Sequence, residues 1–382
     1  MKVLLVGNYE FDGSMSMKIW ADLLARELRT VGIDTQLIAP RPMLGKLKPS
    51  AHGLGKWLGY IDRFVFFPFS LRSAAAGVDL VHLCDHGGAM YATMFKSKPV
   101  IVTCHDMIAV RGARGELPEL HSSPLGKFLQ RWICHGLRRA TRVACVSRAT
   151  LNDVRRILGD DANLCVVLNG MNHPFQPLAS GEVDRRLEQS GGIHAPFVLH
   201  VGSNLGYKNR EGVLRVFAQA SRGTNLQLVI AGEPLDHNLS RLTRELQIED
   251  RIAQFEKPDV AALEALYNRA VCLLFPSHYE GFGWPPIEAQ ACGCPVVASD
   301  IPPFAETLGQ SAILKPTEDE AGMADASRSL VSDESLRSQL RQMGFENVRT
   351  RFQTARMIGE YASLYRELTQ NPDALAMGMD QL

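Results

Sequence analysis

Short apolar runs alternate along the chain with stretches of helical periodicity. The run Lys2–Val6 precedes residues 17–31, where apolar side chains recur every three or four residues, and this predicts a strand, a loop and a helix. Further buried strands are predicted within 34–40, 78–85, 98–106, 142–147 and 164–170. Helices are predicted near 14–31, 86–97, 125–140 and 148–159. This alternation is typical of a parallel sheet that is covered on both faces.

The same rhythm restarts after a segment that is rich in proline and glycine at both ends, residues 174–196. Strands are then predicted within 197–202, 226–232, 252–256, 271–277 and 295–300, with helices over 209–220, 237–246, 259–269 and 285–292. The tail from Asp333 to Thr369 has helical character. We therefore predict two doubly wound α/β domains, residues 1–185 and 186–382, with the last helix near 355–370 packing back on the first domain.

Composition agrees with two globular domains. Of the 382 residues, 46% are hydrophobic and 21% are charged. No run of about 18 uncharged apolar residues occurs, and the charged, glycine-bearing start differs from a signal peptide, so we expect a cytoplasmic protein. The eight cysteines mostly lie inside apolar runs without paired zinc spacing, which favours buried thiols over metal ligands.

The charge is unevenly distributed although the net charge is zero. Residues 1–180 contain 22 Lys and Arg against 14 Asp and Glu, and the remainder contains 19 against 27. This asymmetry fits an anionic acceptor or an anionic membrane surface at the first domain. An attraction between the two halves of the chain explains it equally well.

Candidate chemistry gathers where the strand within 271–277 gives way to a helix. Phe282, Gly283 and Trp284 stand at the entrance of that helix, where free amides and the helix dipole favour a phosphate or a sugar oxygen. Glu280 precedes the turn, and Glu288 follows about one turn into the helix. From there, the Glu288 carboxylate could accept hydrogen bonds from two ribose hydroxyls. An ordinary helix start with acidic residues is the structural alternative.

A second loop of the same kind follows the strand 197–202. It places Ser203, Asn204 and Lys208 at the same edge of the same predicted domain. A lysine beside backbone amides can neutralise a diphosphate without a metal ion. The alternative is a solvated lysine on a surface loop.

These two segments carry a resemblance to a known family. "EGFGWPPIEAQACGCPVVASD", with Glu280 and Glu288 eight positions apart, and "VGSNLGYKN" resemble the retaining nucleotide-sugar glycosyltransferases of family four. In the first domain, "VDLVHLCDHG", "VTCHDM", "VACVSRATLNDV" and "VVLNGMNHPFQP" are similar to successive segments of that family. The resemblance implies the GT-B architecture, in which two Rossmann-like doubly wound domains face a cleft.

The resemblance also implies roles for individual residues. In the second domain, Glu288 binds the ribose, Lys208 binds the diphosphate, and Glu280 with the amides of Phe282 to Trp284 holds the donor sugar. Ser203 and Asn204 belong to the same substrate-binding loop. In the first domain, His105 faces the sugar beside Asp106, and the loop with Gly13 and Ser14 closes over the donor phosphate and the acceptor.

The chain departs from the family pattern at several positions. Tyr207 and Ser203 stand where many relatives carry an arginine, so one positive charge on the leaving group is missing unless Arg210 or a first-domain arginine replaces it. Gly13 stands alone where relatives often have a glycine pair. Lys257 occupies a position that is often glycine in the segment that is expected to contact the base. The identity of the base is therefore left open.

The inferred reaction moves a hexosyl unit of the mannose or glucose type from a nucleoside diphosphate sugar to an acceptor hydroxyl, with retention of configuration. No Asp-x-Asp cluster occurs near the site, so no metal ion or other cofactor is expected. The alternatives are a GT-B sugar phosphorylase, a nucleotide-sugar epimerase and a non-catalytic sugar-nucleotide-binding protein. The first loop lacks the G-x-G-x-x-G pattern of a dinucleotide dehydrogenase, and no nucleic-acid-reading motif is present.

The acceptor is expected to be a carbohydrate or a lipid-linked molecule, as in cell-surface polysaccharide or glycolipid synthesis. Residues 44–72 mix Lys46, Lys48 and Lys56 with several aromatic residues, which is one pattern of peripheral contact with an anionic membrane. A helix packed on the first domain is the favoured interpretation, because residues 64–69 show no clear polar face. A second basic run, from Arg131 to Arg156, keeps the membrane interpretation open.

Overall fold

The computed structural model describes residues 1–13, 15–50, 53–160, 163–189, 192–193 and 195–370. Its contacts divide the chain into two compact units. The first unit comprises Met1–Asn172 and the helix α15 (Thr354–Gln370), and the second comprises His173–Gln353. The boundary predicted between residues 185 and 186 falls inside α7 (Ser180–Gln189), which packs on α10 (Val260–Arg269) of the second unit.

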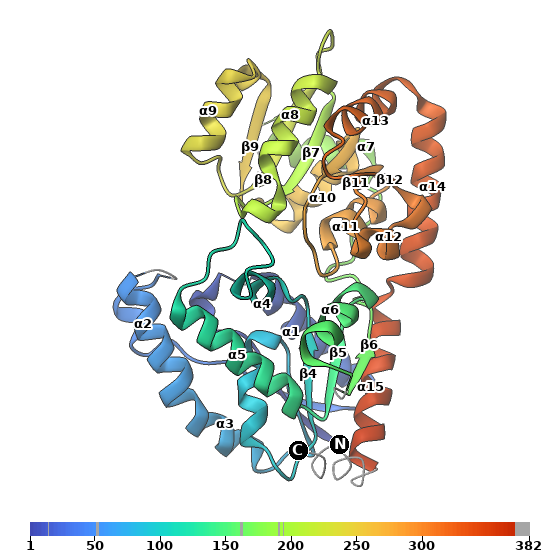
Figure 1. Cartoon of the computed structure of the whole chain (residues 1–382). Coiled ribbons are helices and arrows are strands. Elements are labelled where there is room, and N and C mark those ends of the chain that lie inside the picture. The colour runs from blue at the N-terminus through green and yellow to red at the C-terminus, as the bar shows by residue number, and fades with distance from the viewer. Residues whose placement is uncertain (14, 51–52, 161–162, 190–191, 194, 371–382) are drawn as a thin grey trace. The chain divides into compact units, whose positions relative to one another are not determined.

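The first unit contains a six-stranded sheet in the order β2-β1-β3-β4-β5-β6, and every neighbouring pair is parallel. Figure 1 labels β4, β5 and β6 of this sheet. Its strands are β1 (Lys2–Val6), β2 (Asp34–Ile38), β3 (Leu80–Leu83), β4 (Val100–Cys104), β5 (Arg142–Cys145) and β6 (Leu164–Val166). Its helices are α1 (Met15–Thr30), α2 (Gly53–Ile61), the π-helix η3 (Asp62–Phe66), α3 (Phe67–Ala75), α4 (Ile108–Ala113), α5 (Pro124–Arg139) and α6 (Arg148–Leu158). The parallel sheet predicted for this region is confirmed.

The C-terminal helix α15 completes the core of the first unit. Tyr361 and Tyr365 are fully buried, and their hydroxyls lie 2.9 Å from Thr103 Oγ1 and 2.6 Å from His82 Nδ1. Arg356 donates a hydrogen bond of 2.8 Å to the carbonyl of Leu168. The chain thus returns to its first unit after building the second.

The second unit contains another parallel six-stranded sheet, in the order β12-β11-β10-β7-β8-β9. Its strands are β7 (Phe197–Gly202), β8 (Gln227–Gly232), β9 (Ile252–Glu256), β10 (Cys272–Phe275), β11 (Val296–Ser299) and β12 (Ile313–Lys315). Besides α7 and α10, its helices are α8 (Arg210–Ala220), α9 (His237–Glu245), α11 (Trp284–Ala291), α12 (Pro302–Thr307), α13 (Glu320–Ser332) and α14 (Glu334–Arg351). The order is that of a Rossmann sheet, whose sequence reverses between β7 and β10.

Local chemistry explains where these helices begin. Asp236, Asp259, Asp319 and Asp333 cap α9, α10, α13 and α14, because each side chain accepts a hydrogen bond from an amide of the first turn. The segment predicted as a helix near 86–97 instead forms the 3₁₀ run η4 (His86–Met94). Gly87 and Gly88 at its start lower the helix propensity. The short strand β12 and helix α13 follow the last predicted strand and were not predicted.

Candidate functional site

The reversal of strand order in the second unit positions the predicted loops. β7 and β10 are hydrogen-bonded neighbours, but their crossover connections run to opposite sides of the sheet. The loops that follow their carboxyl ends therefore separate and leave room for a ligand, which is the general binding position in open α/β sheets. The loop after β7 carries Ser203 to Lys208, and the loop after β10 carries Ser277 to Gly283.

An ion pair joins these two loops. Lys208 Nζ lies 2.6 Å from Glu280 Oε1, and the two side chains are 16% and 9% exposed. The ammonium group also lies over the rings of Tyr207 and Phe275, at 5.4 and 5.3 Å from their centroids. The structure thus brings together Lys208 and Glu280, which are 72 positions apart in the sequence.

Two further hydrogen bonds hold the loops in register. The His278 amide donates to the Tyr207 carbonyl at 2.8 Å, and Asn209 Nδ2 donates to the Pro276 carbonyl at 3.0 Å. Asn209 has a left-handed backbone with a φ of 53°, and its side-chain oxygen caps α8 by accepting from the Gly212 amide. Because Asn209 makes both contacts, the position of Lys208 is fixed by its neighbour in the chain.

Asn204 connects the β7 loop to the loop after β8. The Asn204 amide donates a 2.9 Å hydrogen bond to the carboxylate of Glu233, and Asn204 Nδ2 donates to the Pro234 carbonyl at 2.7 Å. Ser203 is half-buried beside them. Glu233 was not predicted as a site residue, since nothing around it in the sequence distinguishes it from a surface acid.

The buried side chain of Arg210 holds this loop in place by hydrogen bonds. Its guanidinium donates to the carbonyls of Gly202 and Glu233, at 2.5 and 2.7 Å, and to the side chain of Asn204. The residue is only 4% exposed, and burial lowers the pKa of its guanidinium. These bonds engage Arg210 with the protein's own backbone, so the structure gives it a role in holding the loop.

The start of α11 lies beside the ion pair in the sequence. Gly283 caps the helix with a left-handed backbone, at a φ of 89°, and a Cβ atom there would lie 2.5 Å from Cε1 of Phe304. The Phe282 ring is buried and packs edge-on against Phe352, at 5.5 Å between centroids. Only its backbone can therefore face a ligand. Trp284 is the first residue of α11, which begins one position before the predicted Pro285.

Glu288 lies in the second turn of α11 and is 5% exposed. Its Oε2 accepts a 2.9 Å hydrogen bond from the hydroxyl of Tyr267 on α10. Burial and the neighbouring Glu288 charge raise the pKa of Tyr267 well above its usual value, so the phenol keeps its proton and remains the donor. Tyr267 thus orients the carboxylate. It was not predicted, because a tyrosine on the apolar side of a helix looks like an ordinary core residue.

Two buried polar atoms accompany these loops. His200 on β7 is fully buried, and burial together with the charge of Arg210 lowers its pKa to about 3. Its imidazole is therefore neutral, and Nδ1–H donates to the Leu274 carbonyl at 3.1 Å. Among the described residues, neither His200 Nε2 nor Ser277 Oγ has a hydrogen-bond partner. Both residues lie close to where β7 and β10 end, and neither was predicted as a site residue.

In the first unit, His105 follows the carboxyl end of β4. Its Nε2 lies 3.0 Å from the Cys84 carbonyl, and its ring meets Trp20 edge-on at 5.0 Å. Burial lowers the pKa of His105, while the nearby Asp85 opposes that effect, so the ring is neutral and Nε2–H donates. The predicted histidine is therefore held firmly at a strand end.

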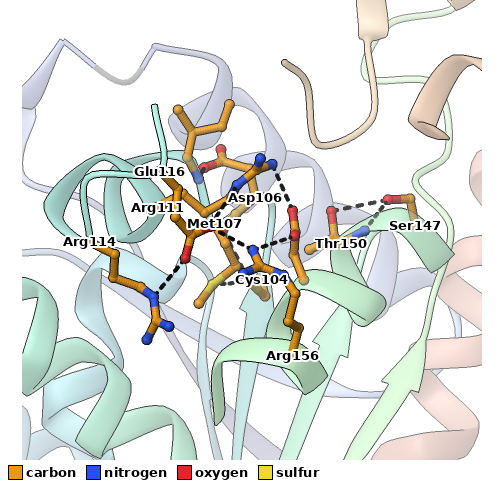
Figure 2. Close-up of polar contacts among 11 residues, drawn as sticks. Cys104, Asp106, Met107, Arg111, Arg114, Glu116, Ser147, Thr150 and Arg156 are labelled. Carbon is orange, nitrogen blue, oxygen red and sulfur yellow. Dashed lines mark hydrogen bonds and ion pairs between the residues drawn. The ribbon is translucent and has the colours of Figure 1, made fainter. Parts of the chain in front are cut away.

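Asp106 follows His105 and turns toward the start of α4. Its Oδ1 accepts a 2.9 Å hydrogen bond from the Ile108 amide. Figure 2 shows Asp106 next to a cluster of ion pairs on α4, α6 and the loop after α4. In that cluster, Glu116 lies 2.7 Å from Arg114 and 2.8 Å from Arg156, and these arginines lower its pKa to about 2.

The loop after β1 borders an indentation in the first unit. Gly13 has a left-handed backbone, with a φ of 73°, and Ser14 lies outside the described residues. Asp12 forms a 2.9 Å ion pair with Arg63 of η3. Asn8 donates a 2.5 Å hydrogen bond to Asp85 after β3. With Tyr91, these side chains line a small cavity of about 20 Å³ where the strand order of this sheet reverses.

Two features are absent from the part of the chain that the structure describes. No group of three or more His, Cys, Asp or Glu side chains is arranged to hold a metal ion. No helix within residues 1–370, apart from the undescribed gaps, is long and apolar enough to cross a membrane.

Solved structures with the same arrangement define the class of fold. Sucrose-phosphate synthase from Thermosynechococcus elongatus superposes with a TM-score of 0.78 at 20% identity, covering 97% of this chain and 99% of that chain. Anabaena Alr3699/HepE in complex with UDP-glucose superposes with a TM-score of 0.75 at 16% identity, covering 96% and 100%. The two parallel six-stranded sheets thus form the GT-B fold of glycosyltransferases, as predicted.

Sequence comparison identifies the family. A model described as glycosyltransferase family 4 matches residues 19–174, and one described as glycosyl transferases group 1 matches residues 186–347. O-antigen chain mannosyltransferase RfbU of Salmonella typhimurium is 26% identical over 195 residues, which are 51% of this chain and 52% of that relative. The match thus spans about half the length of that relative. The chain belongs to the family-four glycosyltransferases with the GT-B fold.

Proposed function

We propose that the protein transfers a hexosyl unit from a nucleoside diphosphate sugar to an acceptor hydroxyl, with retention of configuration and without a metal ion. The observation that carries this proposal is the ion pair of Lys208 and Glu280 where strand order reverses in the second unit. In this pair, the ammonium group of Lys208 is proposed to bind the diphosphate and the carboxylate of Glu280 to bind sugar hydroxyls. Both lie near the start of a helix in the sequence, and helix starts favour anions.

In the proposed reaction, cleavage of the glycosyl–phosphate bond leaves negative charge on the diphosphate. The ammonium group of Lys208 and the amides of Phe282 to Trp284 stabilise that charge. Such preorganised donors can each be worth about 2.7–4 kcal/mol. When the diphosphate takes the place of Glu280 at Lys208, the Glu280 carboxylate becomes available for the donor sugar. Glu288, oriented by Tyr267, accepts hydrogen bonds from the ribose hydroxyls.

In the first unit, the neutral imidazole of His105 is proposed to face the sugar. Asp106 and the loop at Gly13 are proposed to contact the substrate, although the structure engages Asp106 with the Ile108 amide. The departing phosphate removes the proton of the acceptor hydroxyl, because both groups lie on one face of the sugar when configuration is retained.

The identity of the substrates is proposed from named relatives. HepE was solved with UDP-glucose, and RfbU is named as an O-antigen chain mannosyltransferase. These names support glucose or mannose as the sugar and a carbohydrate or lipid-linked acceptor in cell-surface polysaccharide or glycolipid synthesis. The cytoplasmic location stays a prediction.

A panel of nucleotide sugars tests this function. The protein is incubated with UDP-glucose, UDP-galactose or GDP-mannose, with and without simple glycoside acceptors, and the released nucleoside diphosphate is measured. We expect release that depends on the acceptor, continues in excess EDTA and yields a product whose anomeric proton signal shows retention.

Each alternative has its own readout in this assay. Sugar interconversion without release identifies an epimerase, and turnover that requires inorganic phosphate identifies a phosphorylase. Binding of a nucleotide sugar without any turnover identifies a binding protein. An activity that is abolished by EDTA and restored by a divalent cation contradicts metal independence.

A further inference from the structure

The helical segment from α2 to α3 exposes an apolar stripe on its outer side. Leu54, Trp57, Ile61, Val65 and Phe69 are spaced by three or four residues, and they are 59%, 57%, 37%, 50% and 70% exposed. This spacing keeps them on one face of a helix. The wider π-turn η3 lies between Ile61 and Phe67 and offsets the drift that repeated four-residue steps produce in an α-helix. We call these five residues the outer stripe.

The inner side of the same segment is already packed on the first unit. Phe67 and Leu71 belong to its core. A Cβ atom on Gly59 would lie 3.0 Å from the ring of Tyr9, so the helix approaches the body of the unit closely. The segment was predicted to pack on the first domain, and this inner face does so. The outer stripe is therefore apolar surface in excess of what packing requires.

A row of aromatic contacts extends the outer stripe to α5. The ring centroids of Trp57 and Tyr60 lie 5.9 Å apart, those of Tyr60 and Phe64 lie 5.5 Å apart, and those of Phe64 and Trp132 lie 5.4 Å apart. Phe128, one turn before Trp132 on α5, is 61% exposed. Figure 1 shows α2, α3 and α5 along one side of the first unit. The two helical segments thus form one continuous surface.

Apart from the ion pair of Arg63 with Asp12, the charged residues of these helical segments are almost all basic. Residues 43–76 and 121–140 contain one acidic residue, Asp62. Asp62 is 1% exposed and is occupied by the Tyr9 hydroxyl and by three backbone amides. The exposed charged side chains beside the stripe are basic: Lys46, Lys48, Lys56, Arg72, Lys127 and Arg131.

The basic run from Arg131 to Arg156 continues beyond α5, and there arginines form ion pairs with acidic residues. Arg142 pairs with Glu367 at 2.9 Å, and Arg156 pairs with Glu116 and Asp153. These acids offset the positive charge beyond α5. The positive surface is therefore concentrated on α2, α3 and α5, where the apolar side chains are exposed.

We propose that the outer stripe, with Phe128 and Trp132, docks this unit on the surface of an anionic bilayer. Tryptophan, phenylalanine and leucine side chains enter the boundary between headgroups and acyl chains, while the surrounding lysines and arginines meet anionic lipid phosphates. A second copy of the chain fits this surface poorly. A two-fold interface would place basic residues against basic residues without acids between them.

This proposal does not depend on the transferase reaction, because docking uses no residue of the candidate site in the second unit. Binding to vesicles can therefore be measured without a nucleotide sugar. A failure of the vesicle experiment would not contradict the proposed transferase reaction, and a failure of the transferase assay would not contradict membrane docking.

Vesicle flotation with the full chain tests the docking surface. The vesicles contain phosphatidylcholine alone or phosphatidylcholine with phosphatidylglycerol. The test variants are Trp57→Ala with Phe69→Ala, which removes apolar area, and Lys46→Glu with Lys56→Glu, which reverses charge. The matched control is Val260→Ala with Arg222→Glu, which makes both kinds of change at exposed positions of the second unit.

We expect the unaltered protein to float with anionic vesicles and to release as the salt concentration rises. Because each basic residue near the surface contributes roughly a factor of five, the Lys46 and Lys56 variant should bind at least about tenfold more weakly. A similar loss is expected for the Trp57 and Phe69 variant, and the control should keep its binding. Circular dichroism checks that each variant is folded.

Three results would overturn the proposal. One is equal recovery of the protein with neutral and anionic vesicles. Another is undiminished binding by both test variants. The third is a dimer in light scattering that the Trp57 and Phe69 variant abolishes, since the surface would then serve a second copy.

Discussion

Replacing Lys208 by alanine should lower the turnover number for acceptor-dependent diphosphate release by about 100- to 1,000-fold. That range is typical for the loss of one preorganised group that stabilises charge in a transition state. The ammonium group of Lys208 is the cation that the structure places against Glu280, 2.6 Å away. Steady-state kinetics with the best donor from the panel measures the effect.

Two controls separate this effect from loss of folding. Lys208→Ala leaves Glu280 without its cation in a largely buried position, which also lowers stability. Lys208→Ala combined with Glu280→Gln removes that unpaired charge, and its turnover should stay low. The exposed Lys96→Ala variant, in the first unit, should retain full activity. An active, stably folded Lys208→Ala protein would contradict the role of this lysine.

Replacing Gly283 by alanine should lower the free energy of unfolding by about 2–4 kcal/mol and strongly reduce activity. Two free-energy penalties add at this position, one from the backbone conformation and one from a steric contact. An alanine must adopt a φ of 89°, and its Cβ would lie 2.5 Å from the Phe304 ring. Phe304 is fully buried and packs on Phe275, so it cannot move aside without disturbing β10. Denaturant unfolding measures the loss.

Gly309→Ala is the matched control for the free-energy penalty of a left-handed backbone. Gly309 also has a positive φ, 49°, but an added Cβ there would meet no atom within 4 Å. This variant should lose about 1–2 kcal/mol, from the left-handed backbone alone. If both variants lose the same amount, the contact with Phe304 contributes nothing. Activity should fall only for Gly283→Ala, since that change displaces the start of α11.

The alternation of strands and helices could be predicted because parallel sheets bury nearly every strand residue. Runs such as Lys2–Val6 and Phe197–Gly202, in each of which four residues are buried, were located to the residue. β12 was missed because it has only three residues, all of them partly exposed. η4 was taken for a helix because periodicity does not distinguish an α-helix from a series of 3₁₀ turns.

The candidate site could be predicted where glycines, a helix start and charged residues coincide, as at Glu280 and Gly283. Lys208 was predicted as a candidate because it follows a strand and a glycine. His200, Tyr267 and Glu233 could not be found in this way. Their roles depend on contacts with residues far along the chain, which no local pattern encodes.

The segment 44–72 shows a further limit of periodicity. Apolar residues on two faces of a helix look the same in a sequence, although one face is buried and the other is not. The packed interpretation rested on the absence of a polar face near 64–69. The structure shows the reason for that absence, because Phe67 is buried while Val65 and Phe69 are exposed on the other side.

A crystal structure of the protein with a bound nucleoside diphosphate, UDP or GDP, would test the proposed donor site directly. We expect diphosphate oxygens at about 3 Å from Lys208 Nζ and from the amides at the start of α11, with the ribose hydroxyls at Glu288. The Lys208–Glu280 pair should be opened. A nucleotide bound away from the loops after β7 and β10, with that pair intact, would contradict the proposed donor site.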